Sequence, residues 1–270
     1  MLANFPVYKP NFTSYYHPKQ EISSLVPYRK LNHYSYFFRD YRGAFASDFL
    51  ERLPFDGKNK LEVTSLGCSY GQEVYSFAMK FAQRGLKDKV KLTGYDLSQI
   101  AVDYAKGGVY DFYEEVLDNP QVLKNGRCGE YFIPQTDKSL KIATELLPEC
   151  DFKKADIRNL ELPKESQDMV LFNNVLYHIT ENLSEEEQQK VCDSMAKLIY
   201  DAMKIDGLLL TDVEEDYPCA RNLDNALLDL GFVSMGRGIY QKKTQDTIRE
   251  SYIAFKKSYL ENLKKLNQLD

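Results

Sequence analysis

The segment that most limits the fold is a strand-like run that ends in a glycine turn and leads into a helix. Residues 61–66 form a short β-type run, Gly67 follows, and residues 72–84 carry apolar side chains at helical spacing. A second strand pattern covers residues 90–95 and ends at Asp96. Strand, helix and strand in such close succession predict parallel β-α-β units, because parallel neighbours need a crossover connection.

The same alternation resumes later in the chain. The pattern predicts helices over 99–106, 184–203 and 220–230, with Ser98 as the candidate N-cap of the first. It also predicts strands over 150–157, 168–172 and 207–211, and a closing hairpin over 232–243. Residues 109–150 interrupt the alternation and contain one candidate hairpin, 131–133 with 140–143. We therefore expect a doubly wound α/β domain with a small inserted β-subdomain.

The two ends of the chain do not follow this alternation. Residues 1–32 are rich in Tyr and Pro and have weak periodicity, so we interpret them as an irregular N-terminal arm. Residues 41–53 predict a helix that Pro54 stops. Residues 244–270 contain a charged amphipathic pattern, which predicts a C-terminal helix over 245–268.

Composition and charge exclude several classes of protein. The net charge of −5 predicts no broad basic face for nucleic acid. No run is long and apolar enough for a membrane helix, and the N-terminal residues lack the pattern of a secretory signal. The five cysteines are scattered without a C-x-x-C pair, so we expect neither a disulfide framework nor a metal site. These features favour reduced thiols and a cytoplasmic location.

The glycine turn and the next strand end are candidate ligand-binding positions. Gly67, Cys68 and Ser69 lie where ligands enter an open α/β sheet, although an ordinary tight turn would look the same. Asp96 could accept hydrogen bonds from two ribose hydroxyls, or it could cap the following helix. Together they favour a nucleoside-containing ligand without separating nicotinamide from S-adenosylmethionine.

Two later strand ends also carry polar groups. Asp156 could meet the exocyclic amine of an adenine or be a surface turn residue. Asn173 and Asn174 are adjacent amides that need partners, which a ligand or the loop backbone could supply. His178 could act as a base or orient an acceptor, and Tyr177 is a similar candidate; each could also simply pack in the loop.

Several motifs resemble one known family. Residues 67–76 read G-C-S-Y-G-Q-E-V-Y-S and resemble the G-C-S-T-G-E-E-P-Y-S signature of the chemotaxis receptor glutamate O-methyltransferases, the CheR family. Further similar motifs follow the family's order: S-Y-F-F-R at 35–39, G-Y-D-L-S at 94–98, G-G-V-Y at 107–110, F-N-N-V-L at 172–176 and D-G-L-L-L at 206–210. The resemblance covers residues 33–243, which we take as the methyltransferase domain.

The resemblance implies a seven-stranded, mostly parallel Rossmann-like sheet with a small inserted β-subdomain. It also implies S-adenosylmethionine as cofactor and S-adenosylhomocysteine as product. Cofactor-binding positions by motif are Ser35, Arg39, Gly67, Cys68, Ser69, Glu73, Asp96, Leu97, Asp156, Ile157, Asn173 and Asn174. By this resemblance Asp96 holds the ribose, Asp156 lies near the adenine, and Arg39 meets the methionine carboxylate or neighbouring acidic groups.

The departures from the family concern the acceptor side. Asn173 and His178 stand where the family has an Arg and a Tyr near the transferred methyl group, and Gln72 replaces the first Glu of the signature. The family's N-terminal helical domain is expected to be missing. We therefore predict an acceptor on a protein or small molecule other than a chemoreceptor glutamate, with Asn173, Tyr177 and His178 as the candidate catalytic residues.

Two alternatives remain open at this point. A catalytically silent module could keep the cofactor pocket or its shell and bind a partner. A nicotinamide-dependent dehydrogenase is the other, although the glycine turn lacks a clean G-x-G-x-x-G pattern. The sequence does not predict an oligomeric state.

Overall fold

The computed structural model describes most of the predicted domain. It covers residues 37–38, 48–55, 57, 59–111, 127–211, 218–236 and 238–250, without the side chains at 48, 49, 127, 128 and 218. The chain divides into two compact units, residues 1–33 and 34–270, and every described residue lies in the second.

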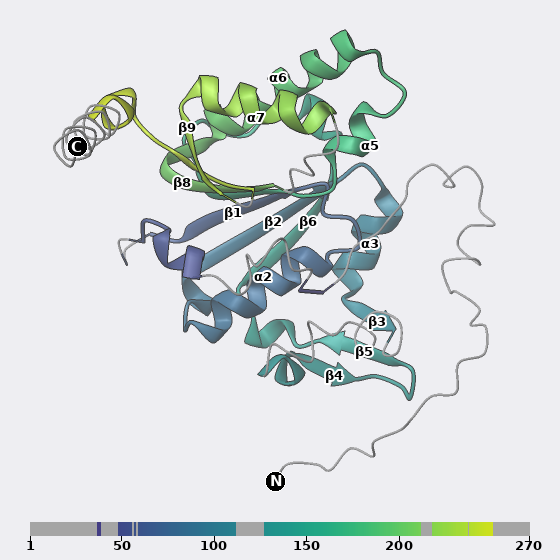
Figure 1. Cartoon of the computed structure of the whole chain (residues 1–270). Helices are drawn as coiled ribbons and strands as arrows, with labels where there is room; N and C mark the ends of the chain where they lie inside the picture. Colours follow the sequence, from purple (N-terminus) through teal and green to yellow (C-terminus); the bar gives the residue numbers. More distant parts are fainter. Residues whose placement is uncertain are drawn as a thin grey trace, which may run out of the picture. The chain divides into compact units, whose positions relative to one another are not determined.

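A seven-stranded sheet forms the centre of the second unit (Figure 1). Its strand order is β6-β2-β1-β7-β8-β10-β9, with β1 Leu61–Leu66, β2 Val90–Asp96, β6 Glu149–Lys154, β7 Gln167–Phe172, β8 Met203–Thr211, β9 Phe232–Gly236 and β10 Ile239–Lys242. The first five strands are parallel, and β10 runs antiparallel to both of its neighbours. The predicted doubly wound, mostly parallel sheet is confirmed.

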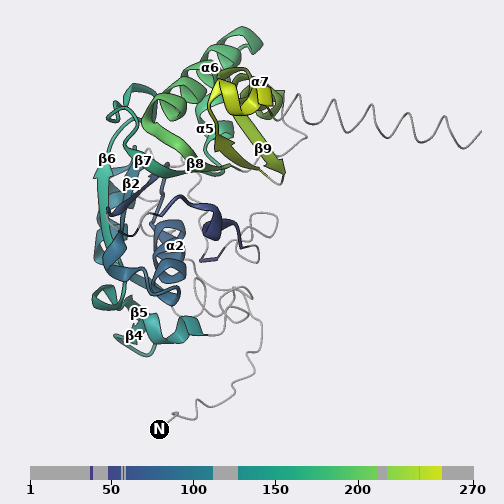
Figure 2. The ribbon, with the colours of Figure 1, turned by 90° about the vertical axis from the view of Figure 1, so that its left-hand side faces the viewer.

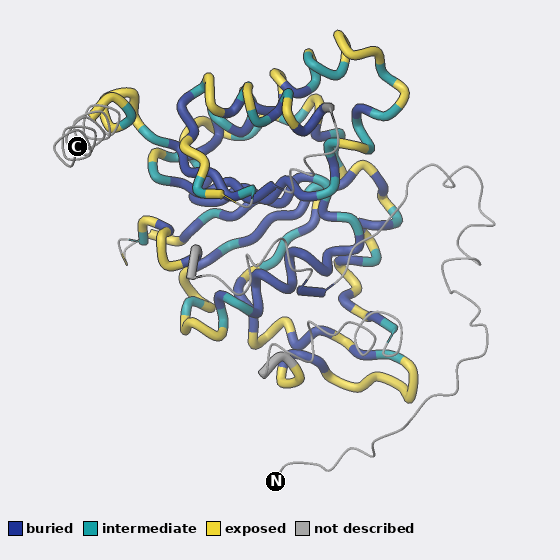
Figure 3. The backbone as a smooth tube through the Cα atoms, viewed as in Figure 1, coloured by how far each residue is buried: buried dark blue, intermediate teal, exposed yellow. Residues whose placement is uncertain are grey.

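Helices cover both faces of this sheet. Two of them, α2 (Gln72–Gln83) and α3 (Gln99–Gly107), lie on one face, and α6 (Glu185–Ala202) and α7 (Pro218–Leu230) lie on the other, as Figures 1 and 2 both show. All six residues of β7 are buried, which is typical of a parallel strand covered on both sides. Figure 3 shows the buried strands between helices whose outer surfaces are exposed.

A second, smaller sheet is inserted between α3 and β6. It contains three antiparallel strands in the order β3-β5-β4, with β3 Val109–Asp111, β4 Phe132–Pro134 and β5 Ser139–Ile142. The predicted hairpin corresponds to β4 and β5, so the small inserted β-subdomain is confirmed. Its buried residues, including Tyr110 and Ile142, belong to the same hydrophobic cluster as the inner side of α2.

Two phenylalanines of the S-Y-F-F-R segment join α2 to the small sheet. Phe37 is fully buried, and its ring packs edge-on against Tyr110 at 4.8 Å and Phe132 at 5.2 Å between ring centroids. The backbone N–H of Phe38 donates to the Ser76 hydroxyl of α2 at 2.8 Å. Residues of the motif therefore act as a link between the helix and the inserted strands.

Three predicted elements differ from the structure. Within the predicted helix over 41–53, residues Asp48–Arg52 form a 3₁₀ helix, and 41–47 lie outside the described residues. The strand predicted over 150–157 ends at Lys154, because the Asp156 side chain accepts from the Arg158 N–H and starts a 3₁₀ turn. The helix predicted to reach Met203 ends one residue earlier, where β8 begins.

The structure contains one short helix that the sequence did not predict, and the first part of a helix that it did. The sequence did not predict α5 (Leu176–Thr180), which directly follows the loop after β7. Residues 245–250 are helical, which confirms the start of the predicted C-terminal helix. The rest of that helix and the predicted N-terminal arm lie outside the described residues, and the proposed domain boundaries stay predictions.

We expect Phe37→Ala to destabilise the domain by about 3–5 kcal/mol, because it removes a buried ring that no neighbour can replace. The exposed Leu228 of α7 supplies the control, since Leu228→Ala should change the free energy of unfolding by about 0.5 kcal/mol or less. Urea denaturation followed by circular dichroism measures both. Equal small effects would mean that Phe37 does not hold the two parts together.

Candidate active site

The loop between β1 and α2 has an unusual backbone. Gly67, Ser69 and Gly71 all have positive φ angles, of 79°, 49° and 85°. Gly71 is the residue that precedes the first turn of α2. Positive φ is costly for a residue with a Cβ atom, so Ser69 is held in a strained conformation.

Glycine at position 67 is required by packing as well as by its φ angle. A Cβ atom placed on Gly67 would lie 2.3 Å from Cγ2 of Val175, in the connection between β7 and α5. The turn therefore brings two strand ends into contact, one after β1 and one after β7.

Asp96 fixes the loop after β1 to the end of β2. Its two carboxylate oxygens accept hydrogen bonds from the N–H groups of Ser69 and Ser98, each at 2.8 Å. The N–H groups of Gly67 and Cys68 both donate to the Tyr95 carbonyl, at 2.7 and 2.9 Å. Ser98, not Asp96, caps α3 with its side chain, which agrees with the prediction for Ser98 and removes the capping alternative for Asp96.

Glu73 connects α2 with two neighbouring strands. Its buried carboxylate accepts a hydrogen bond from the Ser65 hydroxyl of β1 at 2.8 Å, and a second one from the Asn173 side-chain amide at 2.7 Å. Asn173 directly follows β7. Because β1 leads to β2 on one side and β7 to β8 on the other, this contact crosses the topological switch point of the sheet, where ligands bind in open α/β folds.

The other polar atom of the Asn173 side chain has no partner. Asn173 is 6% exposed, and its Oδ1 atom meets no hydrogen-bond donor in the described part of the chain. Leaving a buried acceptor unsatisfied costs about 1–3 kcal/mol, so such an atom calls for an explanation. The next residue, Asn174, has a φ angle of +55°, which places a second strained backbone at this point.

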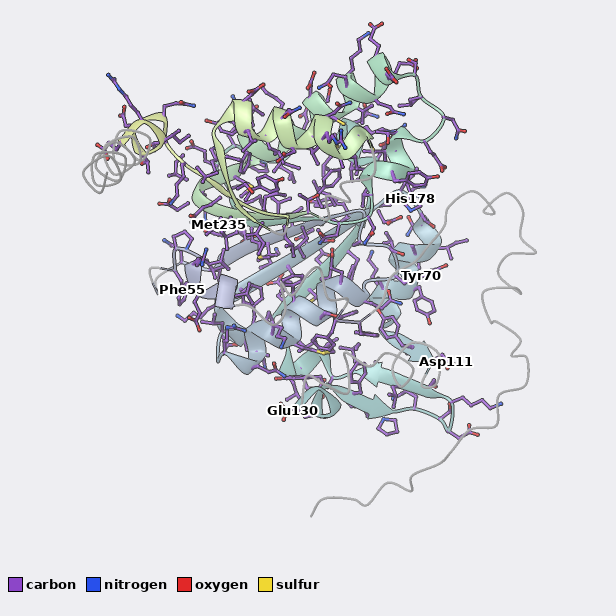
Figure 4. The ribbon with its side chains drawn as sticks, viewed as in Figure 1. Phe55, Tyr70, Asp111, Glu130, His178 and Met235 are labelled. Carbon is purple, nitrogen blue, oxygen red and sulfur yellow. The ribbon has the colours of Figure 1, made fainter. Side chains whose placement is uncertain are left out.

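The helix α5 carries the two remaining candidate residues. The Tyr177 side chain is 46% exposed, and its ring lies edge-on to the half-buried His178 ring at 5.5 Å between centroids. Figure 4 shows His178 and Tyr70 of the glycine loop at the same, right-hand end of the sheet. His178 follows β7 and Tyr70 follows β1, so both come after the carboxyl ends of parallel strands, as the predicted cofactor-binding positions do.

The adenine candidates follow β6. Both Asp156 oxygens are bound by the Arg158 guanidinium, at 2.9 Å from Nε and 2.7 Å from Nη2, and this pairing lowers the pKa of the Asp156 carboxyl. Ile157 is buried in the hydrophobic cluster that also contains Leu66. Leu97, after β2, is instead 48% exposed.

The structure thus gathers many of the predicted positions at the ends of three adjacent strands. These are Gly67, Cys68, Ser69, Glu73, Asp96, Leu97, Asn173 and Asn174. Asp156 and Ile157 follow the next strand, β6, and Ser35 and Arg39 lie outside the described residues. The sequence analysis did not single out Ser65, which binds Glu73, or Arg158, which binds Asp156. Each had a visible signal: Ser65 is a hydroxyl residue in an apolar strand, and Arg158 stands two positions after an Asp.

Comparison with known proteins identifies the family. The CheR methyltransferase SAM-binding domain matches residues 18–222 of the chain. The chain belongs to the CheR methyltransferase family. A chemotaxis protein methyltransferase of Borreliella burgdorferi is 24% identical over 218 residues, which cover 76% of this chain and 71% of that protein. This membership places the chain in a family of S-adenosylmethionine-dependent methyltransferases and decides against the nicotinamide alternative.

Solved methyltransferase structures are also similar to the chain. An S-adenosylmethionine-dependent methyltransferase from Mesorhizobium loti has a TM-score of 0.31 and 16% identity, with 63% of this chain and 54% of that chain covered. Phosphoethanolamine N-methyltransferase 2 of Haemonchus contortus, in complex with S-adenosyl-L-methionine, has a TM-score of 0.40 and 14% identity, with 75% and 39% covered. The chain thus spans about half or less of these two solved proteins.

No helix in the described ranges is long and apolar enough to cross a membrane. Within the same ranges, no group of three or more His, Cys, Asp or Glu side chains could hold a metal ion.

We expect Asp96→Asn to lower the free energy of unfolding by about 1–3 kcal/mol, because an amide has only one oxygen and one of the two backbone N–H groups loses its acceptor. Asp103→Asn on the exposed side of α3 is the matched control and should cost about 0.5 kcal/mol or less. Chemical denaturation measures both variants. Equal stabilities would show that the Asp96 contacts do not hold the loop.

We expect Cys68 to resist alkylation in the native CheR domain. Burial, with smaller contributions from Asp96 and Glu73, raises the pKa of the Cys68 thiol well above its usual value. The thiolate is the reactive form, so at pH 8 a raised pKa leaves almost none of it. Treatment with iodoacetamide at pH 8, followed by peptide mass spectrometry, should label Cys68 in urea and not in the folded protein. Equal labelling in both states would contradict the burial of this thiol.

Proposed function

We propose that this chain binds S-adenosylmethionine across the carboxyl ends of β1, β2 and β7, and methylates a protein or small molecule. The observation that carries the proposal is the buried Asn173 side chain at the switch point, whose Nδ2 donates to Glu73 and whose Oδ1 meets no donor among the described residues. The cofactor supplies an electrophilic methyl group on a positively charged sulfur. The protein then has to position the reactants more than it has to react with them.

Asp96 is suited to hold the ribose. Each of its oxygens accepts one backbone N–H, and an ionised carboxylate oxygen can accept more than one hydrogen bond. The remaining lone pairs are available to two adjacent hydroxyl groups. The exposed Leu97 offers an apolar surface next to this carboxylate, which suits a purine face.

The adenine would meet residues that follow β6. Asp156 retains acceptor capacity beside its Arg158 partner, and Ile157 supplies apolar surface from the neighbouring core. Gly67, Cys68 and Ser69 support the cofactor through the loop after β1, and Asn174 lies across from them. Ser35 and Arg39 complete the proposed pocket on the basis of the family motif.

The acceptor would approach α5. His178 and the exposed Tyr177 lie there and could orient an acceptor or take its proton. Since Asn173 and His178 replace an Arg and a Tyr of the family motif, we propose that the acceptor is not a chemoreceptor glutamate. A cytoplasmic location fits the four free cysteines of the described residues.

We expect the wild-type chain to bind S-adenosylhomocysteine in calorimetric titration, and Asp96→Ala to bind it about 10–100-fold more weakly, because hydrogen bonds to a charged group are lost. Asp103→Ala, which changes an exposed carboxylate of α3, should leave the affinity unchanged. No binding by the wild type would sink the proposed pocket.

The silent binding module remains the second candidate, because two positions near the transferred methyl group depart from the family. It predicts cofactor binding without transfer. Incubation of the wild type with tritium-methyl-labelled cofactor and a cell lysate separates the two: a labelled product above the Asp96→Ala background supports the enzyme, and none supports the module.

A further inference from the structure

The orientation of the Asn173 amide follows from its neighbour. The side-chain nitrogen of Asn173 lies 2.7 Å from Glu73 Oε1 and donates a hydrogen bond to it. This is the orientation that a carboxylate favours, because its oxygens are hydrogen-bond acceptors. The oxygen, Oδ1, lies on the other branch of the amide and cannot turn toward Glu73 without losing this hydrogen bond.

The position of Oδ1 points to a ligand rather than to the fold. Asn173 lies directly after β7 at the switch point, beside the strained Asn174 and three residues before the start of α5. The atom is buried, and no donor reaches it from the described part of the chain. A ligand that brings an N–H or O–H group would satisfy it.

The chemistry of the atom selects among methyl acceptors. A carbonyl oxygen can only accept hydrogen bonds, so an amine or hydroxyl nucleophile complements it. An ionised carboxylate would place its lone pairs against those of Oδ1 in a buried site, without a donor between them. The side chain therefore favours nucleophiles that carry hydrogen.

We propose that Asn173 Oδ1 accepts a hydrogen bond from the methyl acceptor's nucleophile, and that this nucleophile is an amine or a hydroxyl group rather than a carboxylate. The inference rests on the proposed function. The nucleophile's lone pair forms the new bond to the methyl carbon as the carbon–sulfur bond breaks, with its electron pair going to sulfur. The displaced N–H or O–H proton passes to His178 or to water.

Two cofactor analogues test the position of Oδ1. Sinefungin carries an amine where the cofactor carries its methyl group, and S-adenosylhomocysteine has neither. We expect the full chain to bind sinefungin about tenfold more tightly than S-adenosylhomocysteine in calorimetric titration. Asn173→Leu should abolish this preference, so that the variant binds the two analogues with equal affinity.

Ser65→Ala is the matched control, because it also removes a donor to Glu73 and keeps Oδ1 in place. It should retain the preference for sinefungin. A preference that survives Asn173→Leu overturns the inference. A wild type that binds neither analogue overturns the proposed function itself.

A second measurement uses only the wild type and does not depend on the folding of a variant. Methyl esters of carboxylates release methanol in mild alkali, whereas methylated amines and ethers are stable. Product labelled from tritium-methyl cofactor in a cell lysate should keep its label after alkali. Release as volatile methanol would overturn the amine or hydroxyl assignment and leave the methyltransferase function intact.

Discussion

The site depends on one buried carboxylate. Glu73 lies in the first turn of α2, and its oxygens hold the Ser65 hydroxyl of β1 and the Asn173 amide after β7. A carboxylate removed from water is stable only when donors replace its hydration. The helix and the two strand ends are therefore fixed together, and Asp96 does the same for the end of β2 through two backbone N–H groups. Side-chain carboxylates, rather than the loops alone, set the geometry of the candidate site.

The sequence predicted those parts of the fold that depend on residue patterns close together in the chain. The β-α alternation, the glycine turn at Gly67 and the Ser98 cap each depend on residues within one or two turns of chain. The closing hairpin was also predicted, and its strand β10 is held by Lys242, whose ammonium donates to the Tyr200 and Met203 carbonyls at the end of α6. The family motifs added the number of strands and the cofactor.

The parts that the sequence did not predict depend on distant or competing contacts. Glu73 and Asn173 are 100 positions apart, and no local pattern indicates that their side chains meet. The strand predicted through Ile157 ends earlier, because an Arg two positions after Asp156 favours a turn. Apolar spacing over 41–53 was compatible with a long helix, yet the described residues before Pro54 form a 3₁₀ helix.

The contact between Gly67 and Val175 has an evolutionary consequence. A Cβ atom at position 67 would overlap Cγ2 of the valine, and each residue lies at the end of a different strand. The two positions therefore cannot drift independently in related chains. Bulk gained at one must be lost at the other, and the positive φ angle of Gly67 makes the first exchange costly in any case. Among homologues, positions 67 and 175 should therefore covary, although 108 positions separate them in the sequence.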